Sequence, residues 1–411
     1  MTAPVFGMQF FRPTTETVPA LGADFSKILV IDTSADASNA EIPLNTAIRS
    51  SSSNPDFVAA LGTGLLADAV KGINDQLINL NAGADVTVFR VAEGDTVAET
   101  AAAIAEVVNS LSEVPSAVNA TPRIVVAGRT AWRPDADTVS PVVAALQANL
   151  GKILAIAPVD VDDTSADAAI DARETMSSER LMPIGVAARV WEGASVVTRP
   201  MAPRIAGLIA RVDNEGDGLP FNPFANQPLY GLAGVSRKIP FSLMDGSTEG
   251  QQMLAANVSI VVEGEAGVDG AVADGGLVFI GTDNAMTGEL WEQIHQVRGT
   301  DYIVTQVANI TRQFLGKNKI SADMAEAWIN SIAYALRDHK AADRILGYTP
   351  KSQMFKASQN SPEDIRMGIL KLDIGIEPAP VFKRADHTIR RYRPAVADLV
   401  QRIIERLDQS A

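Results

Sequence analysis

Short apolar runs alternate with helical patterns through the first half of the chain. Almost entirely apolar runs of about four to six residues suit strands that are buried on both faces of a sheet. They lie at 28–31, 86–91, 123–128, 153–156 and 184–188. Helical patterns lie near 54–80, 98–112, 141–150 and 166–179. Strands that alternate with helices predict a mostly parallel sheet covered by helices, so the expected fold class is α/β.

The pattern changes in the second half, and the fold becomes α+β overall. Residues 213–246 are rich in Pro, Gly and Asn and predict a long surface loop or a domain junction. Apolar strands follow near 258–263 and 276–281, and a largely helical stretch covers 289–346. Four apolar residues at four-residue spacing predict a core-facing stripe on one helix there rather than a cofactor pocket: Met324, Trp328, Ile332 and Leu336.

Extended patterns and one amphipathic helix mark the ends of the chain. Residues 1–25 hold an apolar cluster without helical period, which predicts either an extended arm or a first strand of the core. Ser361 and Pro362 begin a short helix that stops near Gly368, and extended stretches follow at about 369–377 and 387–393. The last helix, 395–408, has six apolar residues at helical spacing: Val396, Leu399, Val400, Ile403, Ile404 and Leu407.

Composition removes several classes of chemistry. The 411 residues predict two or three domains. The absence of cysteine from the sequence excludes disulfides, thiolate zinc sites and iron–sulfur ligation. Only three histidines are present, at 295, 339 and 387, which leaves little material for a histidine metal site. We expect surface positions for His339 and His387, because charged residues flank the first and the second lies in a basic segment.

The net charge of −14 is unevenly distributed. Residues 291–411 carry 18 of the 35 basic and 14 of the 49 acidic side chains, so their net charge is +4 and that of residues 1–290 is −18. An acidic body disfavours direct binding of nucleic acid. We also expect no secretory signal peptide and no membrane insertion, because the start lacks a basic and apolar leader and the longest uncharged run contains three prolines.

Motifs that could carry catalysis are weak. Gly62-Thr63-Gly64 has the spacing of a dinucleotide loop, but a helical pattern precedes it, so we expect a turn between two helices. An acidic cluster lacks the glycine and glutamate of a calcium loop, and we expect solvated carboxylates that cap helices: Asp160, Asp162, Asp163, Asp167 and Asp171. No serine nucleophile elbow occurs. We therefore expect no catalytic residues, no metal and no cofactor.

A basic cluster lies near the end of the chain. Five positive charges fall within eleven residues, opposed by Asp386 alone: Lys383, Arg384, Arg390, Arg391 and Arg393. The cluster is typical either of a charged edge strand that resists aggregation or of a segment that docks on an acidic partner.

Three passages, in this order and spacing, resemble the contractile tail sheath proteins of bacteriophages and of phage-tail-like particles. The first is Ile42-Pro43-Leu44-Asn45-Thr46 followed by the glycine turn at 61–69. The second runs from Ala202-Pro203-Arg204 to Val212-Asp213, and the third from Trp291 through Arg298-Gly299-Thr300-Asp301 to Leu346. The resemblance covers most of the chain.

The resemblance implies a multi-domain subunit with a subtilisin-like α/β domain and extended terminal arms. Its parts would be an N-terminal arm at 1–25, an α/β part of the core at 26–115, the subtilisin-like domain at 116–265, a tube-facing C-terminal domain at 266–378 and an arm with a helix at 379–411. In this family the arms add strands to the sheets of neighbouring subunits. The matching arm contacts are Val5, Phe6, Met8, Phe10, Phe11, Thr388, Ile389, Arg390, Arg391 and Tyr392.

The resemblance also implies partners and a mechanism. Subunits would stack as hexameric rings around a tail tube protein, with baseplate and tail terminator proteins at the ends, in a virion tail assembled in the host cytoplasm. Contraction would drive the tube through the envelope for genome delivery. The basic candidates for the tube-facing surface are Lys340, Arg344, Lys351, Lys356 and Arg366. The alternatives are the sheath of a contractile injection or tailocin device and an α/β hydrolase or nucleotide-binding enzyme.

Overall fold

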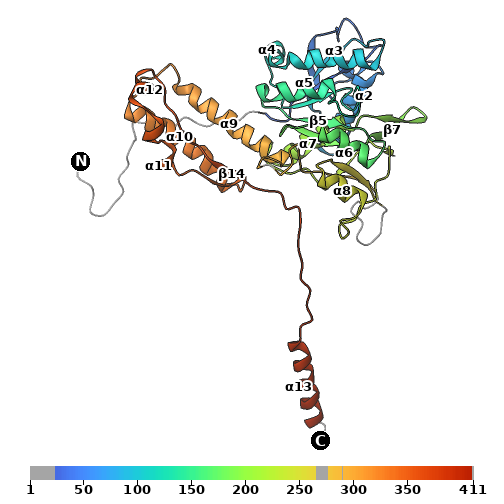
Figure 1. Cartoon of the computed structure of the whole chain (residues 1–411), viewed down its shortest axis with the longest axis vertical. Helices are drawn as coiled ribbons and strands as arrows, with labels where there is room; N and C mark the ends of the chain where they lie inside the picture. The colour runs from blue at the N-terminus through green and yellow to red at the C-terminus, as the bar shows by residue number, and fades with distance from the viewer. Residues whose placement is uncertain (1–23, 265–275, 289, 410–411) are drawn as a thin grey trace. The chain divides into compact units, whose positions relative to one another are not determined.

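The structure is a computed structural model that describes residues 24–264, 276–288 and 290–409 (Figure 1). The chain divides into two compact units, Met1–Ala379 and Pro380–Ala411, and each is described by itself. The first contains mixed α/β structure, with several small sheets and most of the helices.

A mostly parallel sheet forms the centre of the first unit. Its strand order is β2-β3-β1-β4, with β2 antiparallel to β3 at the edge and the other neighbours parallel. Single bridges from Ile124 to Ile156 and from Ile184 to Ser259 extend it towards the parallel pair β5–β6 and β11. The strands are β1 (Ile28–Thr33), β2 (Ala47–Ser51), β3 (Asp85–Val91), β4 (Ile124–Ala127), β5 (Ala157–Asp160) and β6 (Leu181–Ile184). Every residue of β1 is buried, as the continuous apolar run at 28–31 predicts.

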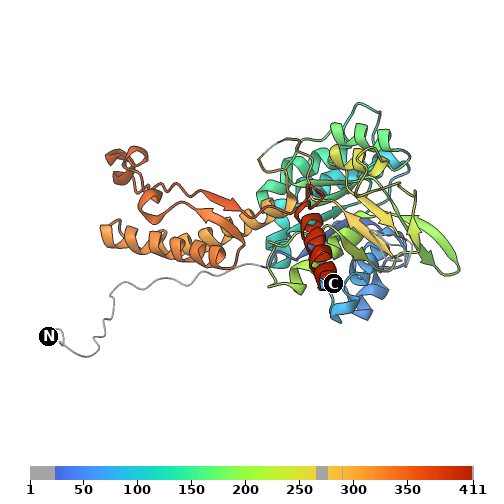
Figure 2. The same cartoon turned by 90° about the horizontal axis from the view of Figure 1, so that it is seen from below.

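Helices cover this sheet, with α3 packed beside α5 and α2 beside α7 (Figures 1 and 2). Thr96 and Glu99 form a complete capping box at the start of α3, and Pro141 occupies the first turn of α5. The helices are α1 (Pro55–Ala60), α2 (Leu65–Asp75), α3 (Val97–Asn109), α4 (Val114–Val118), α5 (Pro141–Asn149), α6 (Ala166–Glu174) and α7 (Ala202–Glu215). Short 3-10 turns lie at Ile78–Leu80, Leu111–Glu113 and Leu150–Ile153.

Two of the predicted strands are misplaced. The run 153–156 closes the 3-10 turn after α5, where Leu154 adopts a left-handed conformation (φ 50°) and the amide of Ala155 donates to the carbonyl of Leu150. The strand β5 begins at Ala157, although Ile156 already bridges to Ile124, and Ile153 and Ala155 are buried in the turn that precedes it. The run 184–188 is likewise divided between the end of β6 and the start of β7.

Smaller sheets complete the α/β body around the irregular stretch that begins after α7. The strands β7 (Ala188–Glu192) and β8 (Ser195–Arg199) form a hairpin that β10 (Gly234–Val235) joins, and this hairpin was not predicted. The strands β11 (Ile260–Glu263), β12 (Leu277–Ile280) and β9 (Gln227–Leu229) form an antiparallel sheet beside α8 (Glu249–Ala255), which confirms the strands predicted near 258–263 and 276–281. One core, from Ile28 to Ile294, crosses the domain borders expected at 115 and 265.

A second, smaller core holds the helical end of the first unit together. Ile303 and Ile310 of α9 (Ile294–Phe314) pack against Ile332 and Leu336 of α10 (Ala322–Ala341). The predicted stripe is confirmed as core for Ile332 and Leu336, which are fully buried, and Trp328 packs against this core, whereas Met324 is only partly buried and lies outside it. The remaining elements are β13 (Ile345–Tyr348), α11 (Lys351–Met354), a 3-10 turn (Ala357–Gln359), α12 (Pro362–Arg366) and β14 (Ile376–Pro378).

The second unit consists of an extended segment and one helix. Residues 380–393 form neither helix nor strand, and α13 begins directly after them. The helix α13 (Pro394–Asp408) confirms the predicted amphipathic helix, and none of its residues is buried. Across the described ranges, no helix combines the length and apolar composition that crossing a membrane requires.

Candidate functional site

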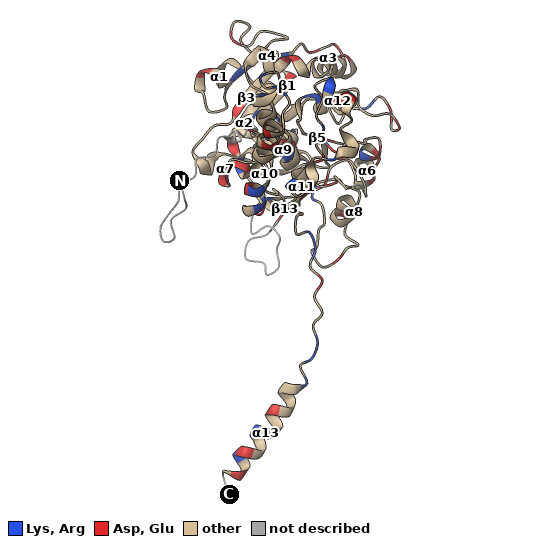
Figure 3. Cartoon of the chain, turned by 90° about the vertical axis from the view of Figure 1, so that its left-hand side faces the viewer, with Lys and Arg blue, Asp and Glu red and all other residues tan. Residues whose placement is uncertain are grey.

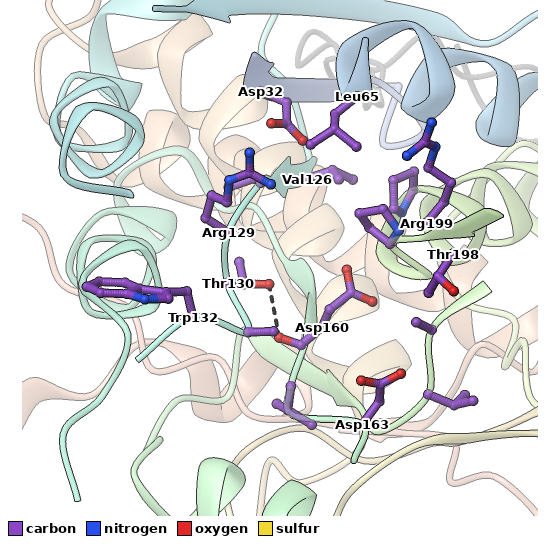
Figure 4. Close-up of a pocket in the computed structure, with 18 residues that line it drawn as sticks. Asp32, Leu65, Val126, Arg129, Thr130, Trp132, Asp160, Asp163, Thr198 and Arg199 are labelled. Atoms are coloured by element: carbon purple, nitrogen blue, oxygen red, sulfur yellow. Dashed lines mark hydrogen bonds between the residues drawn. The ribbon is translucent and has the colours of Figure 1, made fainter. Parts of the chain in front are cut away.

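A cavity of about 580 Å³ opens at the carboxyl ends of β1, β4 and β5 (Figure 4). This edge of a parallel sheet is where α/β enzymes place their catalytic groups. Asp32 comes from β1, Arg129 and Thr130 follow β4, and Asp160 ends β5. The cavity is therefore the place where an enzymatic function would be expected.

The Asp32 carboxylate is almost completely buried in the cavity wall. Its burial raises its pKa to about 6, although the amide of Thr33, which donates at 2.8 Å, and the charge of Arg129 act in the opposite direction. A Cβ atom at position 128 would lie 2.5 Å from the carboxyl carbon of Asp32, so only Gly128 fits there. The local backbone is shaped to enclose this carboxylate.

Asp160 fixes the beginning of α7. Its carboxylate accepts hydrogen bonds from the amides of Met201 (2.8 Å) and Ala202 (3.1 Å), two of the donors that a helix leaves unpaired at its start. Burial raises its pKa to about 7, and these hydrogen bonds lower it in part. Asp160 caps a helix, as predicted for the acidic cluster, but its carboxylate is half-buried in the cavity wall rather than fully solvated. Asp162 instead accepts from the amide of Thr164 in an exposed turn.

The lining of the cavity contains no pair of a serine or cysteine nucleophile with a histidine base. None of its eighteen lining residues is a serine, histidine, cysteine or lysine. The hydroxyl of Thr130 donates to the carbonyl of Asp160 rather than to a base. The glycine turn predicted at 61–64 is confirmed as a connection between α1 and α2, with Gly62 at φ 75°. Among the described residues, no three His, Cys, Asp or Glu side chains lie together as a metal ligand set.

The motif at 202–213 forms a helix whose charged residues are buried. Arg204 makes two hydrogen bonds of 2.7 Å to the carboxylate of Asp68 on α2. Arg211 donates to the carbonyl of Pro228 at 2.6 Å, and Asp213 binds a residue of α9. These partners hold separate parts of the body around α7. Reasoning from the sequence missed this role, although arginine and aspartate at helical spacing in an otherwise apolar stretch were a usable signal.

Two buried ion pairs join the α/β body to α9. Arg298 binds both carboxylate oxygens of Asp213, at 3.0 and 2.6 Å, and both side chains are only 1% exposed. Arg298 also donates to the carbonyl of Phe25 at 3.3 Å. One turn further along α9, Asp301 pairs with Arg180. We call these two ion pairs the α9 joint.

His339 is buried beside the α9 joint, so its predicted surface position is wrong. Its Nε2 atom lies 2.8 Å from the side-chain oxygen of Gln306, and its ring packs against the rings of Phe221 and Tyr302. Burial and, to a smaller extent, the charge of Arg344 lower its pKa to about 4. The charged neighbours on α10 point outwards while the imidazole points into the core. The ring is therefore neutral and structural.

Within the described part of the chain, the small sheet β13–β14 carries no further strand beside β13, whereas beside β14 the carbonyl of Pro378 already accepts a hydrogen bond from the side chain of Gln296 on α9 at 3.4 Å. Its strands pair antiparallel, with Ile345 opposite Pro378 and Tyr348 opposite Ile376. No third strand of the described residues joins either side. Leu346, in the middle of β13, is 58% exposed. An open edge such as that of β13 presents backbone groups that can accept a strand from another chain.

The predicted arm contacts fall into two groups. The five at 388–392 lie in the second unit and are all exposed, with Ile389 at 96% and Tyr392 at 73%. The five N-terminal contacts, Val5, Phe6, Met8, Phe10 and Phe11, lie outside the described residues. The extended segment thus offers apolar side chains and backbone groups together.

The structure separates the predicted basic candidates by their pairing. Lys340 and Arg366 are exposed. Lys351 pairs with Glu326 at 3.3 Å, Lys356 pairs with Asp373, and Arg344 pairs with Asp217. Three of the five charges are therefore balanced within the subunit.

Comparisons with known proteins agree on one class. The chain is 25% identical over 200 residues to a protein of Pseudomonas aeruginosa (strain UCBPP-PA14) described as a prophage major tail sheath protein. That match spans 48% of this chain and 47% of the relative, about half the length of each. No protein-family model matches the chain.

Two solved structures match over nearly the whole chain. The contracted sheath complex of an extracellular contractile injection system, PVC, has a TM-score of 0.68 at 13% identity and covers 96% of this chain and 100% of its own. The contracted helical sheath of the anti-feeding prophage has a TM-score of 0.67 at 14% identity and covers 95% and 99%. The chain therefore has the fold of contractile sheath subunits. The resemblance to tail sheath proteins predicted from its motifs is confirmed.

Proposed function

We propose that the chain is a structural subunit of a contractile tail sheath, which polymerises as stacked hexameric rings around an inner tube. Contraction then drives the tube through a bacterial envelope, and in a virion tail this delivers the genome. The proposal is supported by the fold that the chain shares with two contracted sheaths along nearly its full length. The finer domain division expected from the sequence, including the subtilisin-like part at 116–265, belongs to the same proposal.

One observation on the chain itself carries the proposal. The same polypeptide has a two-stranded sheet, β13–β14, with no further strand of the described residues beside β13, and a segment at 380–393 that exposes large apolar side chains. Phe382, Ile389 and Tyr392 are between 73% and 96% exposed. A strand donor and a strand acceptor in one chain are the two halves of a head-to-tail link, which repeats without limit in a polymer. The N-terminal cluster at 5–11 is the second proposed donor.

A sheath subunit must also transmit force without coming apart. The α9 joint supplies this rigidity, because the buried Arg298–Asp213 pair fixes the helical end of the first unit to the α/β body. Domains in one chain move relative to each other unless their interface is strong. In the proposed contraction, whole subunits rotate and form new contacts while the strand links keep them connected.

The proposed tube-facing surface lies on the late helices. Lys340 and Arg366 are its strongest candidates, because the other three predicted cations already have partners in the subunit. A basic surface would hold an acidic tube through many weak contacts that salt screens. Baseplate and tail terminator proteins complete the proposed partners, and assembly would take place in the host cytoplasm. The energy would come from new contacts between subunits.

The sheath of an injection device is the second candidate. The observation that favours it is the match to the PVC and anti-feeding prophage sheaths over at least 95% of the chain. Both candidates use the same strand links, so one experiment tests the shared part.

That experiment removes the arm. Deleting residues 380–411 should leave a folded subunit, because the segment adds nothing to either core, but the subunit should not sediment as a polymer. A matched deletion of 394–411 keeps the strand donor and should still polymerise. Circular dichroism checks folding, and ultracentrifugation measures the polymer. If the subunit lacking 380–411 sediments like the full chain, the strand link is wrong.

A further inference from the structure

A short segment before β1 is buried against the α9 joint. Phe25 is 1% exposed, and its ring lies between two partners. The guanidinium group of Arg123 is 4.5 Å from the ring centre, and the ring of Tyr302 on α9 meets it edge-on, with 5.5 Å between the ring centres. Both kinds of contact stabilise a buried aromatic side chain. The ring of Phe25 therefore fixes this segment directly to α9.

The same segment binds both partners of the buried ion pair. The carbonyl of Phe25 accepts a hydrogen bond from Arg298 at 3.3 Å, and the hydroxyl of Ser26 donates to the carboxylate of Asp213 at 3.1 Å. Figure 3 marks the acidic and basic residues along α7 and α9, the two helices that these contacts tie together. We call residues 24–27 the strap.

The strap lies where the two cores of the first unit meet. Phe25 and Tyr302 are buried, but they belong to neither core. Tyr302 continues the contact towards the smaller core, because its ring packs edge-on against the rings of Phe221 and His339. At its other end the strap leads into β1, which begins at Ile28 and is fully buried. A displacement of the strap would therefore remove contacts from both α7 and α9.

We propose that the strap closes the α9 joint, so that α9 is fixed to the α/β body only while the strap is seated, and that tension on the N-terminal arm reaches α9 through Phe25. The inference rests on the proposed function, because the arm carries load only if its apolar cluster at 5–11 is held by a neighbouring subunit. Two sites coupled through a shared contact influence each other in both directions. A pull that withdraws the strap loosens the joint, and a closed joint holds the arm in place.

Amide hydrogen exchange of the full chain in dilute solution tests the closure. In Phe25→Ala, the amides at 298–305 on α9 should exchange at least about ten-fold faster, because truncating a buried phenylalanine usually removes more stability than such a change requires. The matched control is Phe224→Ala, which removes a ring that is 2% exposed and stacks on Phe279 inside the larger core. It should leave the exchange of these α9 amides nearly unchanged. The same pattern of exchange in both variants would show that Phe25 is an ordinary core residue and would overturn the strap.

Two truncations separate the strap from the rest of the arm. Deletion of residues 1–23 keeps the strap, so the α9 amides should exchange as slowly as in the full chain. Deletion of residues 1–27 removes it, so they should exchange as fast as in Phe25→Ala. Fast exchange already after the shorter deletion would mean that residues before 24 protect α9, and this result would overturn the assignment of the strap to 24–27.

Electron microscopy separates this inference from the proposed function. Phe25→Ala keeps both proposed strand donors, so it should still form cylinders, but these should be short or unevenly spaced because α9 is no longer fixed to the body. Cylinders as regular as those of the unchanged protein would overturn the transmission of load through Phe25 and leave the sheath function intact. Absence of cylinders from the unchanged protein would overturn the function, whereas the exchange of single subunits would still decide whether the strap closes the joint.

Discussion

Breaking the α9 joint tests how the chain holds its two cores together. Arg298→Met keeps most of the side-chain volume but leaves the Asp213 carboxylate without its charge partner. Both side chains are 1% exposed, and two hydrogen bonds of 3.0 and 2.6 Å join them. An isolated charge in such a site costs about 3–5 kcal/mol of the free energy of unfolding. We therefore expect a large fall in the urea concentration at the midpoint of unfolding, which tryptophan fluorescence measures.

The matched control is Arg337→Met, because Arg337 pairs with Asp338 at 2.9 Å while both side chains are more than 60% exposed. An exposed pair contributes about 0–1 kcal/mol, so this variant should stay close to the unchanged protein. A double variant, Arg298→Met with Asp213→Leu, removes both charges and should regain much of the lost stability. If Arg298→Met loses no more than Arg337→Met, the joint is not a buried ion pair and the argument for rigidity fails.

Two further predictions concern the α/β body. The pKa of Asp160 is about 7 in the folded state, against an ordinary value of 3.8. Between these two pH values the folded state binds one proton that the unfolded state has lost. The free energy of unfolding should therefore fall as the pH rises from about 4 to 7, and this residue should cause no further change above that range. Asp160→Asn keeps the helix cap but cannot titrate, so between pH 5 and pH 7 the variant should lose about 2 kcal/mol less of its free energy of unfolding than the unchanged protein. Urea unfolding at each pH measures this difference. An equal dependence of the free energy of unfolding on pH in both proteins would contradict the prediction. Gly207→Ala should lower the free energy of unfolding by about 1–3 kcal/mol, because its Cβ would lie 2.7 Å from the carbonyl oxygen of Ile73 where α7 packs on α2. The control Gly246→Ala, whose Cβ would meet no atom within 4 Å, should change the melting temperature little. Similar shifts in the melting temperature of both variants would show that the two helices are not in close contact.

Much of the fold could be predicted from the sequence where periodicity was long or strong. The buried run at 28–31, the capping box of α3 and the stripe on α10 each produce one stable local structure. Short apolar runs were less informative. Ile153 and Ala155 are as buried as strand residues would be, but the backbone turns at Leu154, and only the contacts of the folded chain decide between a turn and a strand.

The buried polar residues could not be located from the sequence, because their partners are distant in the chain. Arg298 and Asp213 are 85 residues apart, and His339 meets Gln306 from another helix. Charged neighbours made His339 look exposed, although the helix turns its imidazole inwards. The groove between α10, α11 and α12 could not be predicted for the same reason, since it is assembled from three separate segments, near 320–329, 351–355 and 365–370.

Whether this chain polymerises as a sheath can be seen by electron microscopy of the purified protein at high concentration. We expect hollow cylinders built from stacked rings with six-fold symmetry, joined through the arms. A protein that stays strictly monomeric, or that forms only disordered aggregates, would show that the chain is not a sheath subunit.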